Sequence, residues 1–318
     1  MTPKYRAADL SKARTIPFAK RKNKVSINQF AQAPDWEAIT ADPLAGLPDV
    51  LAAQDLTAVA DAIASAHREG RAVIFMLGGH VVKTGCSPLL IDLVRRKVIT
   101  HLAMNGATAI HDYEIARFGQ TSEDVAENLK DATFGMVDET GREMNEAFQS
   151  GQEHGCGAGE ALARALLERN AENAGSSLMV AAFEAEVPVT VHVAIGAEII
   201  HQHPSCQGAA LGEASYTDFR VLIESLKSLG DGGVVVNVGS AVVLPEVFLK
   251  ALTLARNLGA AVNDFTAVNI DMIRHYRPEV NVIGRPVQTG GRGIHITGHH
   301  EIMLPLLHSA IAWRLKDA

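Results

Sequence analysis

Short, wholly apolar runs alternate with helical segments along most of this chain, and this alternation constrains the fold more than any other feature. Residues 72–77, AVIFML, have the composition of a strand that is buried on both faces, and residues 232–243, GGVVVNVGSAVV, are typical of a strand that leads into a glycine turn. Between such runs lie segments with apolar residues at helical spacing, among them residues 48–69 and 245–259. Strands joined by helices of crossover length form parallel sheets. The pattern therefore predicts an α/β fold with a mostly parallel sheet and helices on both faces.

The chain contains no long or compositionally biased linker that would divide it. With 318 residues, 47% of them hydrophobic, it can bury one large core. Residues 1–47 are polar, basic and punctuated by proline, so we expect an N-terminal arm that packs on the body or on a neighbouring subunit. Residues 48–318 are predicted to form a single domain, in which residues 120–149 contribute polar helices around Gly135 and Gly141.

Charge and composition exclude several classes of partner. Only 20% of the residues are charged and the formal net charge is −7, which disfavours nucleic acid or an anionic membrane because both require a basic surface. No apolar run reaches the roughly 18–20 residues of a membrane span, and no apolar core follows the basic N-terminus as in a secretory signal. Three cysteines, far apart and odd in number, indicate a reducing compartment. We therefore predict a cytoplasmic protein.

The loop GGHVVKTG, residues 78–85, raises the question of a phosphate site. Val82 precedes Lys83 where a nucleoside-triphosphate P-loop requires glycine, and the GxGxxG fingerprint is also absent. Even so, Gly78 and Gly79 follow a buried strand and open a helix. Glycine there lets the backbone approach a ligand, and helix N-termini attract anions. The loop is either a plain tight turn or part of a nucleotide or anion site.

Three other predicted strands are followed by similar small, polar turns. The segments are AMNGATAIHDYE (103–114), NVGSAVVLPE (237–246) and NDFTAVNID (263–271). In open parallel sheets, ligands bind at the carboxyl ends of the strands, so we expect these turns to share one cleft with the first loop. The cofactor-binding candidates at these turns are Gly78, Gly79, His80, Asn105, Gly106, Gly239, Ser240, Thr266 and Asp271.

In the order of these motifs, residues 70–310 resemble deoxyhypusine synthase and its relatives, which have a sirtuin-like variant of the nucleotide-binding fold. FTAVNID resembles the family segment that holds NAD, which implies that Thr266, Ala267 and Asp271 bind the cofactor. GGHVVKTG and MNGATAIHD fall on two further cofactor and site loops, with His80 and His111 in place of family residues and Asp112 matching. In the closing segment, HITGHHEIMLPLLHSA, His299 takes the position of a cofactor-binding aspartate.

The chain departs from the family at its reactive positions. Leu244, Pro245 and Glu246 stand where the family has Lys-His-His with the catalytic histidine. Arg285 stands nearest the imine-forming lysine, and arginine, which keeps its proton, cannot form a Schiff base. The resemblance thus implies the fold, a homotetramer or homodimer and an NAD pocket. It does not imply aminobutyl transfer from spermidine.

We expect proton transfer to depend on the segment HDYE. His111 with Asp112 or Glu114 would form a histidine–carboxylate pair suited to general acid–base chemistry near neutral pH. Lys83, on a predicted site loop, is a candidate nucleophile or a point charge for a cofactor phosphate. We assign His111, Asp112 and Lys83 as catalytic candidates in an NAD-dependent enzyme acting on an amine or another small molecule.

Two alternatives stay open. The clusters HQHPSC (201–206) and GHHE (298–301) supply ligand types that zinc accepts, although their spacing matches no established metal motif, so a metal-dependent hydrolase or lyase is possible. The chain could also be a relative that keeps the nucleotide pocket and has lost catalysis, because the lysine and the histidine are both replaced.

Overall fold

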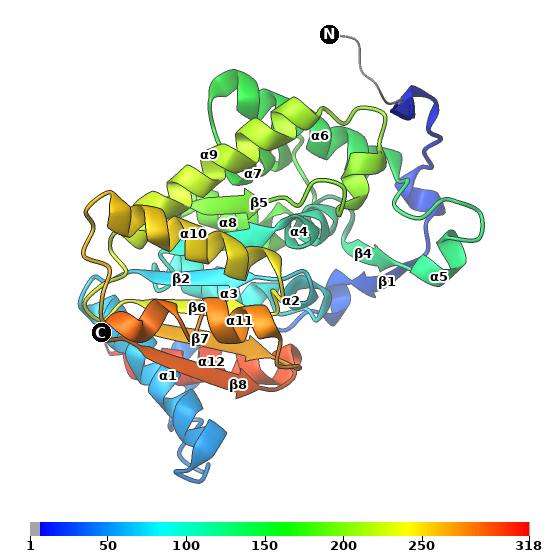
Figure 1. Cartoon of the computed structure of the whole chain (residues 1–318). Helices are drawn as coiled ribbons and strands as arrows, with labels where there is room; N and C mark the ends of the chain where they lie inside the picture. Colours follow the sequence, from blue (N-terminus) through cyan, green and yellow to red (C-terminus); the bar gives the residue numbers. More distant parts are fainter. Residues whose placement is uncertain (1–6, 318) are drawn as a thin grey trace.

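The computed structural model describes residues 7–317, and it confirms the predicted α/β architecture. Six parallel strands form one sheet in the spatial order β5-β3-β2-β6-β7-β8 (Figure 1). Counted along the chain from β2, this order is 3-2-1-4-5-6, the order of the doubly wound dinucleotide-binding fold. The strands are β2 (Val73–Leu77), β3 (His101–Asn105), β5 (Val189–His192), β6 (Val234–Val238), β7 (Thr266–Asp271) and β8 (Arg292–Thr297).

Helices cover both faces of the sheet because alternate residues of its central strands point to opposite sides. Val73, Phe75 and Leu77 of β2 pack into a core with helices α1, α3 and α12. Ile74 and Met76 pack into a second core with helices α9 and α10, and α11 packs against α10 on the same side (Figure 1). These helices are α1 (Leu51–Arg68), α3 (Ser87–Arg95), α12 (His300–Leu315), α9 (Gly208–Leu226), α10 (Val243–Asn257) and α11 (Tyr276–Asn281).

The remaining helices pack beside β5 or lie at the carboxyl edge of the sheet. A four-residue helix, α2, follows β2, and the longer α4 follows β3 directly. The set is α2 (His80–Lys83), α4 (Gly106–Phe118), α5 (Val125–Asn128), α6 (Asp138–His154), α7 (Ala158–Glu168) and α8 (Leu178–Glu184). No helix of the described residues is both long and apolar enough to cross a bilayer.

Residues 7–47 run along the body of the molecule and past the carboxyl edge of the sheet (Figure 1). Residues 1–6 of the predicted arm lie outside the described residues. A short strand, β1 (Asn23–Ser26), pairs antiparallel with β4 (Gln120–Glu123). The expectation of helices throughout 120–149 was therefore wrong at its start, where β4 gains its partner from a segment about a hundred residues earlier in the chain.

Candidate functional site

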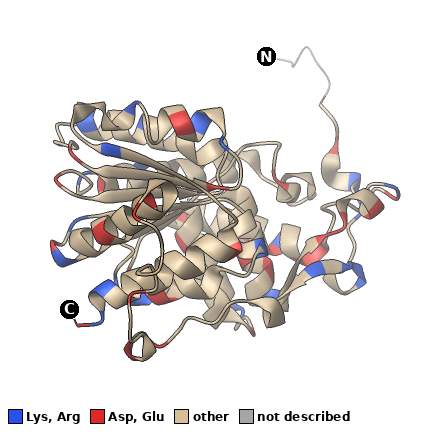
Figure 2. Ribbon diagram, turned by 90° about the horizontal axis from the view of Figure 1, so that it is seen from below, with Lys and Arg blue, Asp and Glu red and all other residues tan. Residues whose placement is uncertain are grey.

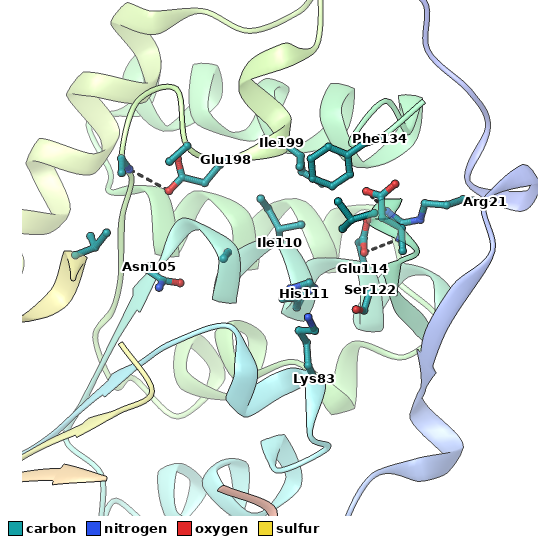
Figure 3. A pocket seen from close by; sticks show the side chains of 16 residues that line it. Arg21, Lys83, Asn105, Ile110, His111, Glu114, Ser122, Phe134, Glu198 and Ile199 are labelled. Carbon is teal, nitrogen blue, oxygen red and sulfur yellow. Dashed lines mark hydrogen bonds and ion pairs between the residues drawn. The ribbon is translucent and has the colours of Figure 1, made fainter. Parts of the chain in front are cut away.

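A cavity of about 350 Å³ lies at the carboxyl edge of the sheet, beside the ends of β3 and β5 (Figure 3). Its size is that of a small-molecule site. The loops after β2, β3, β5 and β6 contribute to its walls, together with the β1–β4 ribbon. The lining residues are Arg21, Lys83, Asn105, Ala107, Ile110, His111, Glu114, Ser122, Glu123, Val125, Phe134, Ala194, Ala197, Glu198, Ile199 and Val243.

One face of α4 forms a long side of the cavity. Ala107, Ile110, His111 and Glu114 stand at helical spacing i, i+3, i+4 and i+7, so their side chains project from the same side of the helix. Asn105 ends β3 and caps this helix, because its side-chain oxygen accepts a hydrogen bond from the Thr108 backbone N–H. The strand end and the cap therefore fix the direction in which His111 points.

A chain of hydrogen bonds joins His111 to a buried carboxylate. The Thr121 hydroxyl donates to Glu114 Oε2 at 2.6 Å, and His111 Nδ1 lies 2.8 Å from the Thr121 oxygen. Since the single hydroxyl proton of Thr121 is directed at Glu114, the Thr121 oxygen must accept from His111 Nδ1–H. His111 is then the tautomer whose Nε2 carries a free lone pair.

The surroundings keep the His111 ring neutral. Burial is the largest effect and lowers the pKa of His111 to about 4, with Lys83 and Arg21 acting in the same direction and Glu114 against it. Lys83 ends α2, is exposed, and points toward His111 in Figure 3. An imidazole that is unprotonated at neutral pH can accept a proton, so His111 has the state that a general base requires.

A buried arginine from the N-terminal segment closes one end of the cavity. Arg21 donates to Glu114 Oε2 at 2.7 Å and lies 3.8 Å from Glu123 Oε1, and both ion pairs are almost fully buried. Glu123 also accepts from the Gly135 backbone N–H and from the Asn128 side chain. The cation and the two carboxylates therefore satisfy one another within the wall of the cavity.

The opposite end of the cavity holds a third carboxyl group, that of Glu198. Glu198 is 8% exposed, its Oε1 accepts from the Ala194 N–H, and burial raises its pKa. Its Oε2 lies 3.4 Å from His201 Nδ1, which itself accepts from the Gly196 N–H. Gly106 lies directly against this carboxyl group, and a Cβ at that position would overlap it.

The predicted pairing of His111 with Asp112 is not formed, which corrects the assignment of Asp112. Its side chain is fully buried on another side of α4 and accepts from the Ser177 hydroxyl and from the Leu178 and Met179 backbone N–H groups. Asp112 thus caps the N-terminus of α8. Burial raises its pKa to about 6, although these hydrogen bonds oppose the shift.

The structure also corrects the predicted position of Thr266 and Ala267 in the sheet. These residues were expected beyond the end of a strand, but they begin β7, where Thr266 pairs with Val234 at the start of β6. They lie at the amino edge of the sheet, roughly five strand residues, or about 17 Å, from the carboxyl edge. Of this motif, only Asp271 reaches the carboxyl edge. The prediction that all the loops converge is therefore confirmed for GGHVVKTG and MNGATAIHD and wrong for the start of FTAVNID.

At the carboxyl ends of β2 and β6, two glycine turns touch each other. Gly78 donates its N–H to the Val238 carbonyl, and a Cβ on Gly78 would overlap the Gly239 carbonyl oxygen. Gly78 is therefore buried in packing and cannot face a ligand, and the Ser240 hydroxyl is used to accept from Leu244 N–H. Gly79 and Gly239 are half-buried and leave part of their backbone accessible.

Histidines lie beside these turns. His80 Nδ1 is 3.0 Å from His300 Nδ1, with the rings at 61°. Burial lowers the pKa of His300. His299 precedes α12 and is exposed, at a side-chain fraction of 64%.

The two histidine clusters proposed as metal ligands do not converge. His203 approaches Ser205 and Asp138, His201 approaches Glu198, and His300 pairs with His80. Residues 7–317 contain no group of three or more histidine, cysteine, aspartate or glutamate side chains placed to hold a metal ion. The metal-dependent alternative therefore has no ligand set in the described part of the chain.

Sequence reasoning missed three charged residues of the cavity wall, Arg21, Glu123 and Glu198, and it missed Thr121, which lies behind the wall and contacts His111. Arg21 lies just before β1 and Thr121 lies in β4. No local sequence pattern reveals that these two strands pair. One available signal was not used: the spacing from Ala107 to Glu114 places Glu114, not Asp112, on the same helix face as His111.

The fold and the cavity define an α/β protein with the strand order of dinucleotide-binding proteins and a small-molecule site at the carboxyl edge of its sheet. No protein-family model matches the chain, and no curated protein matches it.

Among solved structures, the chain is similar to a conserved protein provisionally named LOR/SDH from Methanococcus maripaludis S2, with 14% identity, a TM-score of 0.49, and coverage of 83% of this chain and 70% of that one. It is also similar to a provisionally named deoxyhypusine synthase from Entamoeba histolytica, with 13% identity, a TM-score of 0.47, and coverage of 81% and 87%. The chain is also similar to AgrE in its ternary complex with ornithine and NAD+, with 15% identity and a TM-score of 0.48. The match covers 82% of this chain and 34% of AgrE. At these identities and TM-scores the similarity assigns no function to this chain.

Proposed function

We propose that this protein is an NAD-dependent enzyme that acts on a small molecule held in the cavity, with His111 as the general base. The observation that carries the proposal is the hydrogen-bonded chain from Glu114 through Thr121 to His111, which leaves Nε2 of a cavity-lining imidazole as a free proton acceptor. A base oriented by a third group through its other nitrogen is the arrangement that proton-transfer enzymes use.

The cofactor would bind beside the cavity, over the carboxyl ends of β2, β6 and β7. The backbone of Gly79 is half-buried, and a Cβ there would lie 3.1 Å from His111 Cδ2 and 3.3 Å from Ala107 Cβ, so glycine allows the β2 turn to lie close against the helix that carries the base. The accessible backbone of Gly79 and Gly239, together with His80 and Asp271, would hold the dinucleotide at the position where the strand order reverses. NAD, when bound, exchanges a hydride with the substrate.

The chain's own residues then orient the substrate and move its proton. His111 Nε2 accepts a proton from a substrate hydroxyl or amine group, and Thr121 and Glu114 hold the ring as it becomes charged. The apolar side chains of Ile110, Phe134 and Ile199 exclude water from the reacting atoms (Figure 3). Burial keeps His111 unprotonated at neutral pH, and the charge of Lys83 adds a smaller effect in the same direction.

Calorimetry with NAD+ tests the cofactor assignment. We expect the wild-type protein to bind NAD+ with a dissociation constant of about 1 mM or somewhat lower. This range corresponds to a binding free energy of about −4 to −5 kcal/mol. Gly79→Val adds a side chain that would press against His111 and Ala107, displace the β2 turn and weaken binding by roughly tenfold or more, about 1.4 kcal/mol. Thr266→Val, at the amino edge, is the matched control and should leave binding unchanged. A wild-type protein that binds no NAD+ at millimolar concentration would remove the basis of the proposal.

A further inference from the structure

The N-terminal segment places one charged side chain directly behind the base. Arg21 is 1% exposed at its side chain and reaches Glu114 Oε2, the same oxygen that accepts from Thr121. Among the described residues, Arg21 is the cation that forms an ion pair with Glu114. Thr140 occupies the other carboxyl oxygen with a neutral hydrogen bond at 3.0 Å.

We infer that Arg21 is the positioning residue of this site: it sets which nitrogen of His111 carries the proton and thereby keeps Nε2 open as a base. The inference rests on the proposed function only in assigning His111 the role of a catalytic base. The arrangement itself is a property of the free protein.

The direction of the hydrogen bonds decides the tautomer. Arg21 donates to Glu114 Oε2, and the Thr121 hydroxyl donates to the same oxygen, so the Thr121 oxygen must accept from His111 Nδ1–H. A buried carboxylate without its cation takes up a proton, because an unpaired charge is costly away from water. A protonated Glu114 can donate to Thr121, and Thr121 can then donate to His111 Nδ1.

That reversal would move the imidazole proton to Nε2. Every heavy atom of the chain would keep its place, yet the lone pair would point at Thr121 and the cavity would face an N–H group. The N-terminal segment thus controls a chemical property of His111 through two intervening side chains, without itself touching a substrate.

Nuclear magnetic resonance of ¹⁵N-labelled protein, without substrate or cofactor, tests the inference. Long-range proton–nitrogen spectra distinguish protonated from unprotonated ring nitrogens, and the loss of one signal set in His111→Gln identifies His111 among the 13 histidines. In the wild type, at neutral pH, we expect Nδ1 protonated and Nε2 unprotonated. In Arg21→Met, we expect the ratio of the Nε2–H tautomer to the Nδ1–H tautomer to rise by roughly tenfold or more.

Three further variants make the result specific. Arg21→Lys restores a cation and should keep the wild-type tautomer, whereas Arg14→Met, an exposed arginine of the same segment, should change nothing. Thr121→Val removes one hydroxyl at nearly constant volume and should abolish the Nδ1–H preference even with Arg21 present. It therefore decides the question if Arg21→Met does not fold.

An unchanged Nδ1–H tautomer in folded Arg21→Met, or in Thr121→Val, would overturn the inference. Failure of NAD+ binding, by contrast, would overturn the proposed function and leave this result standing, because the spectra are recorded without cofactor.

Discussion

At the scale of single residues, the site depends on hydrogen-bond direction more than on residue type. His111 and Asp112 are neighbours in sequence, but the helix turns by about 100° between them, so one lines the cavity and the other caps α8. Glu114, the other carboxylate considered as a partner of His111, lies almost one turn beyond it and is connected to it through Thr121.

The titration of His111 gives a prediction with a definite sign. Its pKa in the folded protein, about 4, lies below the unfolded value of about 6.5. Between these values the unfolded chain binds more protons, so His111 makes the protein less stable as the pH falls, by up to about 1.4 kcal/mol per pH unit. Relative to His111→Gln, the wild type should therefore lose stability from pH 6.5 to pH 4, as measured by urea unfolding. A constant difference across this range would show that the folded and unfolded pKa values are equal.

Asp112→Ala should act on stability and not on the cavity. The substitution leaves the buried Leu178 and Met179 N–H groups and the Ser177 hydroxyl without their acceptor, which should cost roughly 2–4 kcal/mol. Asp124→Ala, which removes the cap of the short and exposed α5, is the control and should cost clearly less than Asp112→Ala. Denaturant unfolding measures both. A stable Asp112→Ala protein with altered NAD+ binding would return Asp112 to the site.

At the scale of elements, the strand–helix junctions decide which residues meet. The junctions β2–α2 and β3–α4 bring Lys83, Asn105 and His111 to one cavity, as predicted from the apolar runs and the turns that follow them. The junction at β7 was misplaced because NDFTAVNID was expected to follow a strand, whereas β7 begins at Thr266 within this segment. Strand starts are weakly marked in apolar sequence, and an error of a few residues moves a side chain toward the other edge of the sheet.

Gly106→Ala tests the close contact between α4 and the loop after β5. The added Cβ would overlap the Glu198 carboxyl group, so we expect a loss of roughly 1–3 kcal/mol in the free energy of unfolding. Gly208→Ala, at the first residue of α9 with open space around it, is the matched control and should be neutral or slightly stabilising. Equal stability of the two variants would show that Glu198 can move away from α4 at no cost.

At the scale of the whole molecule, the cavity is assembled from segments that are distant in the chain. The sheet and its helices were predictable because each strand and each crossover helix has a local signature. The β1–β4 ribbon, which supplies Thr121 and lies beside Arg21, was not predictable, because its strands are short and polar and acquire their order only by pairing. Charges of both signs are interspersed along the outer helices (Figure 2).

Cofactor binding should stabilise the molecule as a unit, since the loops proposed to bind NAD follow β2, β6 and β7. At NAD+ concentrations 100 times the dissociation constant, we expect about 2.7 kcal/mol of stabilisation, which corresponds to a rise of several degrees in Tm. Thermal scans of the wild type and of Gly79→Val, with and without NAD+, measure this. A rise of the same size in Gly79→Val would place the cofactor away from the β2 turn.

The most direct test of the account is a crystal structure of the protein with NAD+ bound. We predict that the dinucleotide lies across the carboxyl ends of β2, β6 and β7, with its nicotinamide ring beside Gly79 and facing His111 Nε2. A dinucleotide bound at the amino edge near Thr266, or one whose nicotinamide ring lies away from the cavity, would contradict the account.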